Sequence, residues 1–135
     1  MQTNNTDMEE LNEQFCIACQ NGNLEEAQQL LRENPDINIS VYYECAFRLA
    51  CAYGHLVVSQ WLLQVKPDID ILVDNEYAFR YACANGRLEV AKWLAEEVKP
   101  ARYEITEVTR YDEGNYGIQY KIYENNDRPM DYILK

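Results

Sequence analysis

The sequence is short of the residue types that catalytic and metal sites usually need. Its 135 residues include one histidine, His55, and five glycines that stand apart from one another. A single histidine leaves the Cys16-x-x-Cys19 spacing without the four ligands that zinc requires. A Cys–His catalytic pair would need a cysteine and His55 to converge with an orienting group, and isolated glycines do not form a phosphate-binding loop. We therefore expect no enzyme activity, no metal and no cofactor.

Basic residues and long apolar runs are scarce as well. Twelve lysines and arginines face 23 aspartates and glutamates, which gives a net charge of −11, whereas nucleic acids are bound by clustered basic residues. No apolar run approaches the roughly 18 residues of a membrane span. The polar start from Met1 to Asp7 lacks the apolar core of a signal peptide. The sequence predicts a cytoplasmic protein that binds neither nucleic acid nor membrane.

A step of 32 residues runs through the first hundred positions. Such self-similarity predicts stacked supersecondary units rather than one globular core, and a binding surface rather than a catalytic cleft. The step relates Phe15, Phe47 and Phe79; Ala18, Ala50 and Ala82; Cys19, Cys51 and Cys83; Gly22, Gly54 and Gly86; and Leu24, Leu56 and Leu88. Pro35, Pro67 and Pro100 follow it with a slip of one residue.

The middle unit indicates how each copy folds. Apolar residues recur at i, i+3 and i+4 over 44–52, which predicts a short amphipathic helix. Gly54 ends this helix, a second helix is predicted over 56–64, and Pro67 ends that one. Each unit is therefore expected to be a helix, a tight turn, a second helix and a protruding loop.

The first helices of the second and third units share a charge pattern. Glu44 precedes Arg48 by four residues, and Glu76 precedes Arg80 by four. This order favours an exposed salt bridge along a helix, worth roughly 0.2–0.5 kcal/mol. We expect both pairs to brace their helices, with contact to an anionic partner as the alternative.

Two stretches of the repeat resemble the core of the ankyrin repeat: Ala-Cys-Ala-Tyr-Gly-His-Leu-Val-Val at 50–58 and Ala-Cys-Ala-Asn-Gly-Arg-Leu-Glu-Val-Ala at 82–91. The Pro-Asp-Ile-Asn-Ile and Pro-Asp-Ile-Asp-Ile segments at 35–39 and 67–71 are similar to the segment that leads into that family's loops. The helix-opening Thr-Pro-Leu-His is replaced by Cys-Ala-Phe-Arg and Tyr-Ala-Phe-Arg, so the histidine that braces neighbouring repeats is missing. This variant resembles the short ankyrin arrays of large DNA viruses of amoebae.

The resemblance implies a mainly α fold, an ankyrin-repeat solenoid of three helix-turn-helix units within residues 1–100. The units are expected at about 8–40, 41–72 and 73–100. Eight of the acids lie in the first 40 residues against Arg32 alone. We expect this charge to solvate the end of the array, with an acidic patch for a basic partner as the alternative.

The Tyr-rich tail, residues 101–135, departs from the repeat. Tyr116, Ile118, Tyr120 and Ile122 alternate with other residues, and an Asp-Glu-Gly-Asn turn at 112–115 precedes them. This pattern predicts a β-hairpin, and residues 130–134 offer a third strand. Because a lone hairpin is marginally stable in water, we expect it to cap the third unit. A partner-binding β element and an unpacked tail are the alternatives.

The cysteines at the repeated position are expected to be buried, unpaired thiols of a reducing compartment. Cys19, Cys51 and Cys83 should lie about 10 Å apart, the usual distance between packed helices. A disulfide requires its Cα atoms to lie within about 7 Å. Cys16 and Cys45 fall outside the repeated position.

A monomeric protein–protein interaction module is the function that these features favour. The alternatives are an acidic inhibitor or nucleic-acid mimic that occupies a basic groove, and a structural protein that self-assembles through the hairpin edge. In the ankyrin family, partners bind the loop tips and the exposed side of the first helices. That resemblance implies a partner site at Val41, Tyr42, Glu44, Ala52, Tyr53, Val73, Asp74, Glu76, Ala84, Asn85, Gln20 and Asn21.

Overall fold

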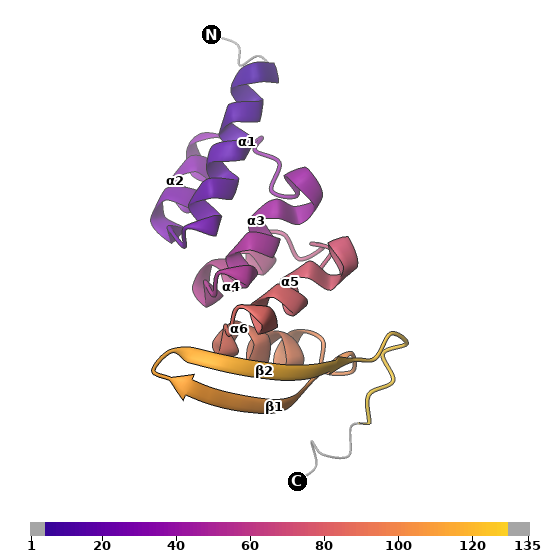
Figure 1. The fold of residues 1–135 in the computed structure, drawn as a ribbon. Coiled ribbons are helices and arrows are strands. Elements are labelled where there is room, and N and C mark those ends of the chain that lie inside the picture. The colour runs from indigo at the N-terminus through magenta and orange to yellow at the C-terminus, as the bar shows by residue number, and fades with distance from the viewer. Residues whose placement is uncertain (1–4, 130–135) are drawn as a thin grey trace.

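Three helical pairs stack along one axis and a β-hairpin closes the far end of the stack (Figure 1). The computed structural model describes residues 5–129. Its elements are α1 (Asn5–Gln20), α2 (Leu24–Glu33), α3 (Val41–Ala52), α4 (Leu56–Val65), α5 (Val73–Ala84), α6 (Leu88–Trp93), a π-helical turn η1 (Leu94–Val98), β1 (Tyr103–Asp112) and β2 (Asn115–Ile122). The expected mainly α fold with a C-terminal hairpin is confirmed. The third strand expected over 130–134 lies outside the described residues.

The turn inside each pair follows from its glycine. Gly54 has a φ of 83°, a left-handed conformation that side chains disfavour. Its N–H donates to the carbonyl of Cys51, which closes the end of α3 before α4 begins at Leu56. A Cβ at Gly54 would lie 2.7 Å from the Arg87 side chain of the next unit. The backbone conformation therefore favours glycine here, and any side chain would also have to displace Arg87.

The repeated apolar residues form one continuous core. Phe15, Phe47 and Phe79 are buried, and so are the alanines and cysteines that share their step. The Phe15 ring packs against Trp61 of the following unit with centroids 6.1 Å apart, and Phe47 packs against Trp93 at 6.4 Å. The first helices of the first two units thus bury their phenylalanines under a tryptophan from the next pair, which is the stacking that a 32-residue step predicts.

The one-residue slip at the third proline has a local structural cause. The second helices of the first two units end with ordinary i→i−4 bonds, from Asn34 to Leu30 and from Lys66 to Leu62. In the third unit the N–H of Lys99 donates to the carbonyl of Leu94, five residues back. A π-turn of this kind is the form that a single inserted residue takes in a helix. The turn η1 therefore absorbs the extra residue without disturbing α6.

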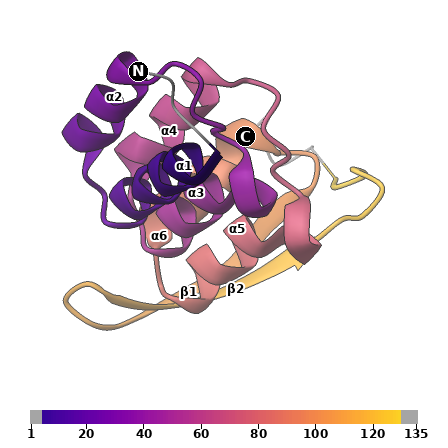
Figure 2. The ribbon, with the colours of Figure 1, turned by 90° about the horizontal axis from the view of Figure 1, so that it is seen from above.

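The hairpin covers the end of the stack. Phe79 has no tryptophan from a following unit, and instead the Tyr103 ring stacks on it at 4.0 Å while Tyr120 meets it edge-on at 5.1 Å. The predicted alternation holds along β2, where Ile118 and Ile122 are partly buried and Lys121 is exposed. Figures 1 and 2 show the hairpin lying across α5 and α6 at the end of the stack.

The starts of α3 and α5 differ from the expected regular helices. Tyr42, Tyr43 and Glu44 have φ values of 55°, 55° and 61°, and the equivalent residues 74–76 have 56°, 55° and 62°. Each is a left-handed turn of three non-glycine residues, which costs roughly 1–2 kcal/mol per residue. Right-handed helix begins only after it. The same irregular geometry in two units indicates that it is a property of the repeat.

Replacing Tyr43 with glycine should relieve this strain. Tyr43 is exposed, so little buried surface is lost, and glycine adopts a φ of 55° without a Cβ clash. We expect Tyr43→Gly to raise the free energy of unfolding by about 1 kcal/mol, measured by urea denaturation. The control is Tyr53→Gly, another exposed tyrosine but with a φ of −96°, which should lower it. A destabilising Tyr43→Gly would contradict the account of strain.

Candidate functional site

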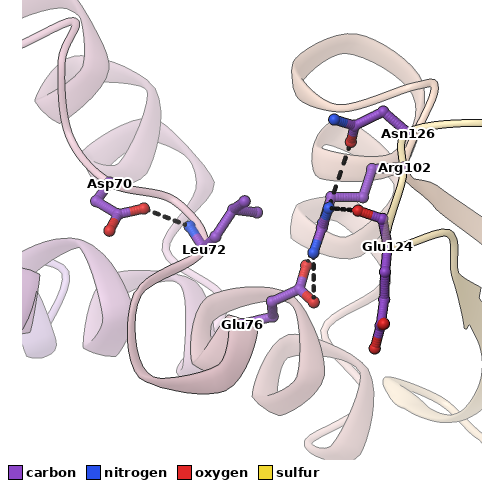
Figure 3. Close-up of polar contacts among 6 residues, drawn as sticks. All are labelled: Asp70, Leu72, Glu76, Arg102, Glu124 and Asn126. Atoms are coloured by element: carbon purple, nitrogen blue, oxygen red, sulfur yellow. Dashed lines mark hydrogen bonds and ion pairs between the residues drawn. The ribbon is translucent and has the colours of Figure 1, made fainter.

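A polar brace joins the first helix of each unit, at positions 12, 44 and 76, to the segment that follows the second helix of that unit. The Asn12 Oδ1 accepts the backbone N–H of Asn38 at 2.9 Å, and the Glu44 Oε2 accepts that of Asp70 at 2.9 Å. In the third unit, the Glu76 carboxylate accepts two hydrogen bonds from Arg102, at 2.6 Å from Nε and 3.1 Å from Nη2 (Figure 3). All three contacts span 26 residues. A polar contact thus recurs at the same step in all three units.

The predicted salt bridges Glu44–Arg48 and Glu76–Arg80 are wrong, because both glutamates form the brace instead. Both glutamates are buried, at 7% and 6% exposure, and the ion pairs of the described residues are Arg48–Asp74, Lys66–Asp68 and Arg102–Glu76. The left-handed turn rotates Glu44 towards the next loop and away from Arg48. Exposed pairing is worth a few tenths of a kcal/mol, whereas a buried carboxylate requires hydrogen-bond donors.

Arg48 instead supports the left-handed turn before it. Its Nε donates to the carbonyl of Tyr43 at 2.8 Å and its Nη2 to that of Tyr42 at 3.0 Å. The guanidinium also lies over the Tyr77 ring, 4.7 Å from its centroid, and within 3.5 Å of Asp74. Planar stacking and a rigid fork of donors are properties of arginine that lysine lacks. Arg48 thus stabilises the left-handed turn at 42–44, which forms the tip of the second unit.

The predicted partner residues divide by exposure. Tyr42, Tyr53, Asp74, Ala84, Asn85 and Asn21 are exposed, Val41, Val73 and Gln20 are partly buried, and Glu44, Ala52 and Glu76 are buried. The buried three have no surface to offer a partner, because Glu44 and Glu76 form the brace and Ala52 lies in α3 under its neighbours. Gln20, Asn21 and Tyr53 do come together, around an open depression that His55 and Arg87 also line.

Two exposed aromatic residues were missed by the sequence reasoning. Tyr43 is 79% exposed beside Tyr42, and Tyr81 is 46% exposed on α5, where it stacks on Tyr77 with centroids 4.0 Å apart. The 32-residue step could have predicted the exposure of Tyr81, because Ile17 and Leu49 are the equivalent residues on the outer side of the first helices. The resulting surface is formed by Tyr42, Tyr43, Tyr53 and Tyr81, and we name it the tyrosine surface.

The cysteines of the repeated position are buried as expected, and all five cysteines are free. Burial raises the pKa of Cys19, Cys51 and Cys83 to about 12. We expect these three thiols to react slowly with an alkylating reagent at pH 8, because they are inaccessible and protonated. Pulse alkylation of the native protein followed by peptide mass spectrometry measures this. Rapid labelling of Cys51 without unfolding would contradict the fold described above.

Neither a metal centre nor a membrane-spanning helix is found among the described residues. Among residues 5–129, no three histidine, cysteine or acidic side chains gather as metal ligands would. No helix in the same range has the length and apolar character needed to cross a bilayer.

Comparison with known proteins agrees with the geometry. A family model described as ankyrin repeats (3 copies) matches residues 15–106, which is more than half of the chain. No curated protein and no solved structure matches the chain. The matched residues run from the C-terminal part of α1 through the second and third helix-turn-helix units to the first residues of β1. By repeat, stacking and matched family model, the chain belongs to the ankyrin-repeat family.

Proposed function

We propose that this protein recognises a protein partner through the tyrosine surface and the loop tips beside it, without catalysis. Ankyrin repeats are generally protein–protein interaction modules. The observation that supports this particular surface is its four exposed tyrosines, which are between 43% and 79% accessible. Tyrosine is enriched among the residues that dominate binding energy. Asp74, Ala84, Asn85 and Asn21 extend the proposed surface.

Rigidity of the surface supports the proposal further. Arg48 bonds the carbonyls of Tyr42 and Tyr43, and Asn85 donates to the carbonyl of Ala52 at 2.8 Å, next to Tyr53. Side chains that are already ordered lose less entropy when a partner binds. These bonds fix the backbone that carries Tyr42, Tyr43 and Tyr53, which lowers the entropy cost of ordering it when a partner binds.

Truncation of two tyrosines tests this surface. We expect Tyr42→Ala with Tyr53→Ala to weaken partner binding by more than about 2 kcal/mol, roughly thirtyfold in Kd. The melting temperature should change little, since both side chains are exposed. A partner captured from the native cell extract would be titrated by calorimetry against wild type and variant. The matched control is Val57→Ala, which is exposed on α4 and should bind like wild type. An equal loss of affinity in the double tyrosine variant and in Val57→Ala would show that the partner does not bind through these tyrosines.

A basic partner is the second candidate. All eight acids of the first 40 residues are exposed, from Asp7 in α1 to Asp36 after α2. An acidic inhibitor or nucleic-acid mimic would use this end of the stack and would lose affinity steeply with salt. The same titration repeated from low to high salt separates the two candidates, because contacts through tyrosine depend less on ionic strength.

Self-assembly through the hairpin is the third candidate. From Thr106 to Asp112, β1 is exposed, and an open strand edge is able to pair with another copy. We expect a monomer, and light scattering after size-exclusion chromatography measures its mass directly. Five free cysteines are consistent with a reducing cytoplasm. If the likeness to viral arrays holds, that cytoplasm is the host's.

A further inference from the structure

Two cysteines outside the repeated position face each other between the first and second units. Helices α1 and α3, which carry Cys16 and Cys45, pack side by side. One step further along the stack, the equivalent positions hold Arg48 and Tyr77, whose side chains are in contact at 4.7 Å. By the same step, Cys16 and Cys45 occupy facing positions on α1 and α3. A hydrogen bond between the two thiols has the largest effect on the pKa of each.

The two thiols differ in exposure and in protonation. Cys16 is buried, whereas Cys45 is half-buried and lies near the Arg48 guanidinium. The hydrogen bond from Cys16 lowers the pKa of Cys45 to about 6, against the opposing effect of burial, and Arg48 lowers it further. The pKa of Cys16 is raised, first by the contact with Cys45 and then by burial. The contact between the two thiols thus favours the thiolate at Cys45, the more exposed of the pair, and the protonated thiol at the buried Cys16.

We propose that Cys16 and Cys45 form a reversible disulfide between the first two units, produced by exchange with a small disulfide such as oxidised glutathione. The Cys45 thiolate attacks one sulfur of the small disulfide, which forms a mixed disulfide and releases one glutathione thiolate. Cys16 then loses its proton to that thiolate and attacks the Cys45 sulfur, which releases the second glutathione as a thiolate. Two protein thiols are oxidised, and one glutathione disulfide is reduced to two thiols.

The neighbouring side chains favour this order of attack. Only the thiolate is nucleophilic, and Cys45 is the thiolate of the pair. Once Cys45 is in the mixed disulfide, the contact that most raises the pKa of Cys16 no longer exists. Cys16 is then the nearest thiol able to displace glutathione. Because Cys45 directly follows the left-handed turn at 42–44, the bond would tie the tip that carries Tyr42 and Tyr43 to α1.

The intact chain, incubated with oxidised and reduced glutathione at pH 7, tests the proposal. We expect peptide mapping by mass spectrometry to find a Cys16–Cys45 link that dithiothreitol removes. Cys45→Ser should slow the reaction with glutathione disulfide by about tenfold or more, because its reactive thiolate is lost. Cys16→Ala should stop at the glutathione adduct on Cys45. Circular dichroism confirms that each variant is folded.

Cys19→Ala is the matched control, since Cys19 lies one helical turn from Cys16 in the same helix and is likewise buried. It should form the Cys16–Cys45 link at the wild-type rate. A link that joins Cys16 to Cys19 instead, a Cys45→Ser variant that reacts as fast as wild type, or wild type that stays fully reduced in excess glutathione disulfide would each overturn the proposal.

Discussion

Replacing Tyr103 with alanine is expected to lower the free energy of unfolding by about 3–5 kcal/mol, the usual cost of removing a large buried aromatic side chain. Tyr103 is fully buried and stacks on Phe79 at 4.0 Å. Phe15 and Phe47 are covered by tryptophans of a following unit, and Phe79 depends on the tail. Without the ring, the last phenylalanine of the array would border a cavity or water.

Urea denaturation followed by circular dichroism measures this loss. The matched control is Tyr111→Ala in the same strand, since Tyr111 is 69% exposed and should change stability by less than about 0.5 kcal/mol. Deletion of residues 101–135 should lower the melting temperature further or drive the protein to oligomerise. If Tyr103→Ala and the truncated chain are as stable as wild type, the hairpin is not a cap and becomes the first candidate for partner binding.

Breaking the buried ion pair between Glu76 and Arg102 should have an effect of similar size. Arg102→Ala leaves a buried carboxylate without its partner, and such a change typically costs about 3–5 kcal/mol. Arg102 also donates to the carbonyl of Glu124 at 2.8 Å, so the pair joins α5 to the segment after the hairpin. Replacing both residues, as Glu76→Leu with Arg102→Leu, should recover most of the loss, because no buried charge remains.

The pair also predicts how stability depends on pH. Burial alone would raise the pKa of Glu76, but the hydrogen bonds and charge of Arg102 outweigh it, so the pKa is lowered. A carboxylate with a lowered folded-state pKa contributes stability above its unfolded pKa, about 4.3, and loses it as the pH falls through the folded value. Wild type should therefore lose stability below about pH 4 more steeply than Glu76→Gln. Parallel curves for the two proteins would show that Glu76 is not the responsible group.

The sequence was sufficient to predict the units, their core and the hairpin, because these depend on periodic apolar residues and on turn residues close in the chain. Phe15, Phe47 and Phe79 recur at a fixed step and are all buried. Gly54 and the Asp112–Asn115 turn lie where the chain reverses direction, and their residue types favour such turns. Such features can be recognised within a window of a few residues.

The buried glutamates were mispredicted because their partners lie 26 residues away. The spacing of Glu44 and Arg48 describes a helix surface only if both residues are helical, and Glu44 is not. No local pattern distinguishes a left-handed turn from the first turn of a helix when the residues involved are tyrosine, aspartate or asparagine. The exposure of Tyr43 follows from the same turn, which is why it was missed too.

The contacts at the end of the third unit decide where the array stops. In the first two units the brace donor is the third residue after the proline, and in the third it is Arg102, the second residue after Pro100. Its side chain replaces a backbone N–H, and Tyr103 then lies over Phe79 where a fourth unit would begin. The array is thus able to grow by duplication of its middle unit upstream of α6, because the copy would find matching neighbours on both sides. Growth is closed downstream, because the Arg102 side chain takes the place of the loop N–H and Tyr103 covers Phe79.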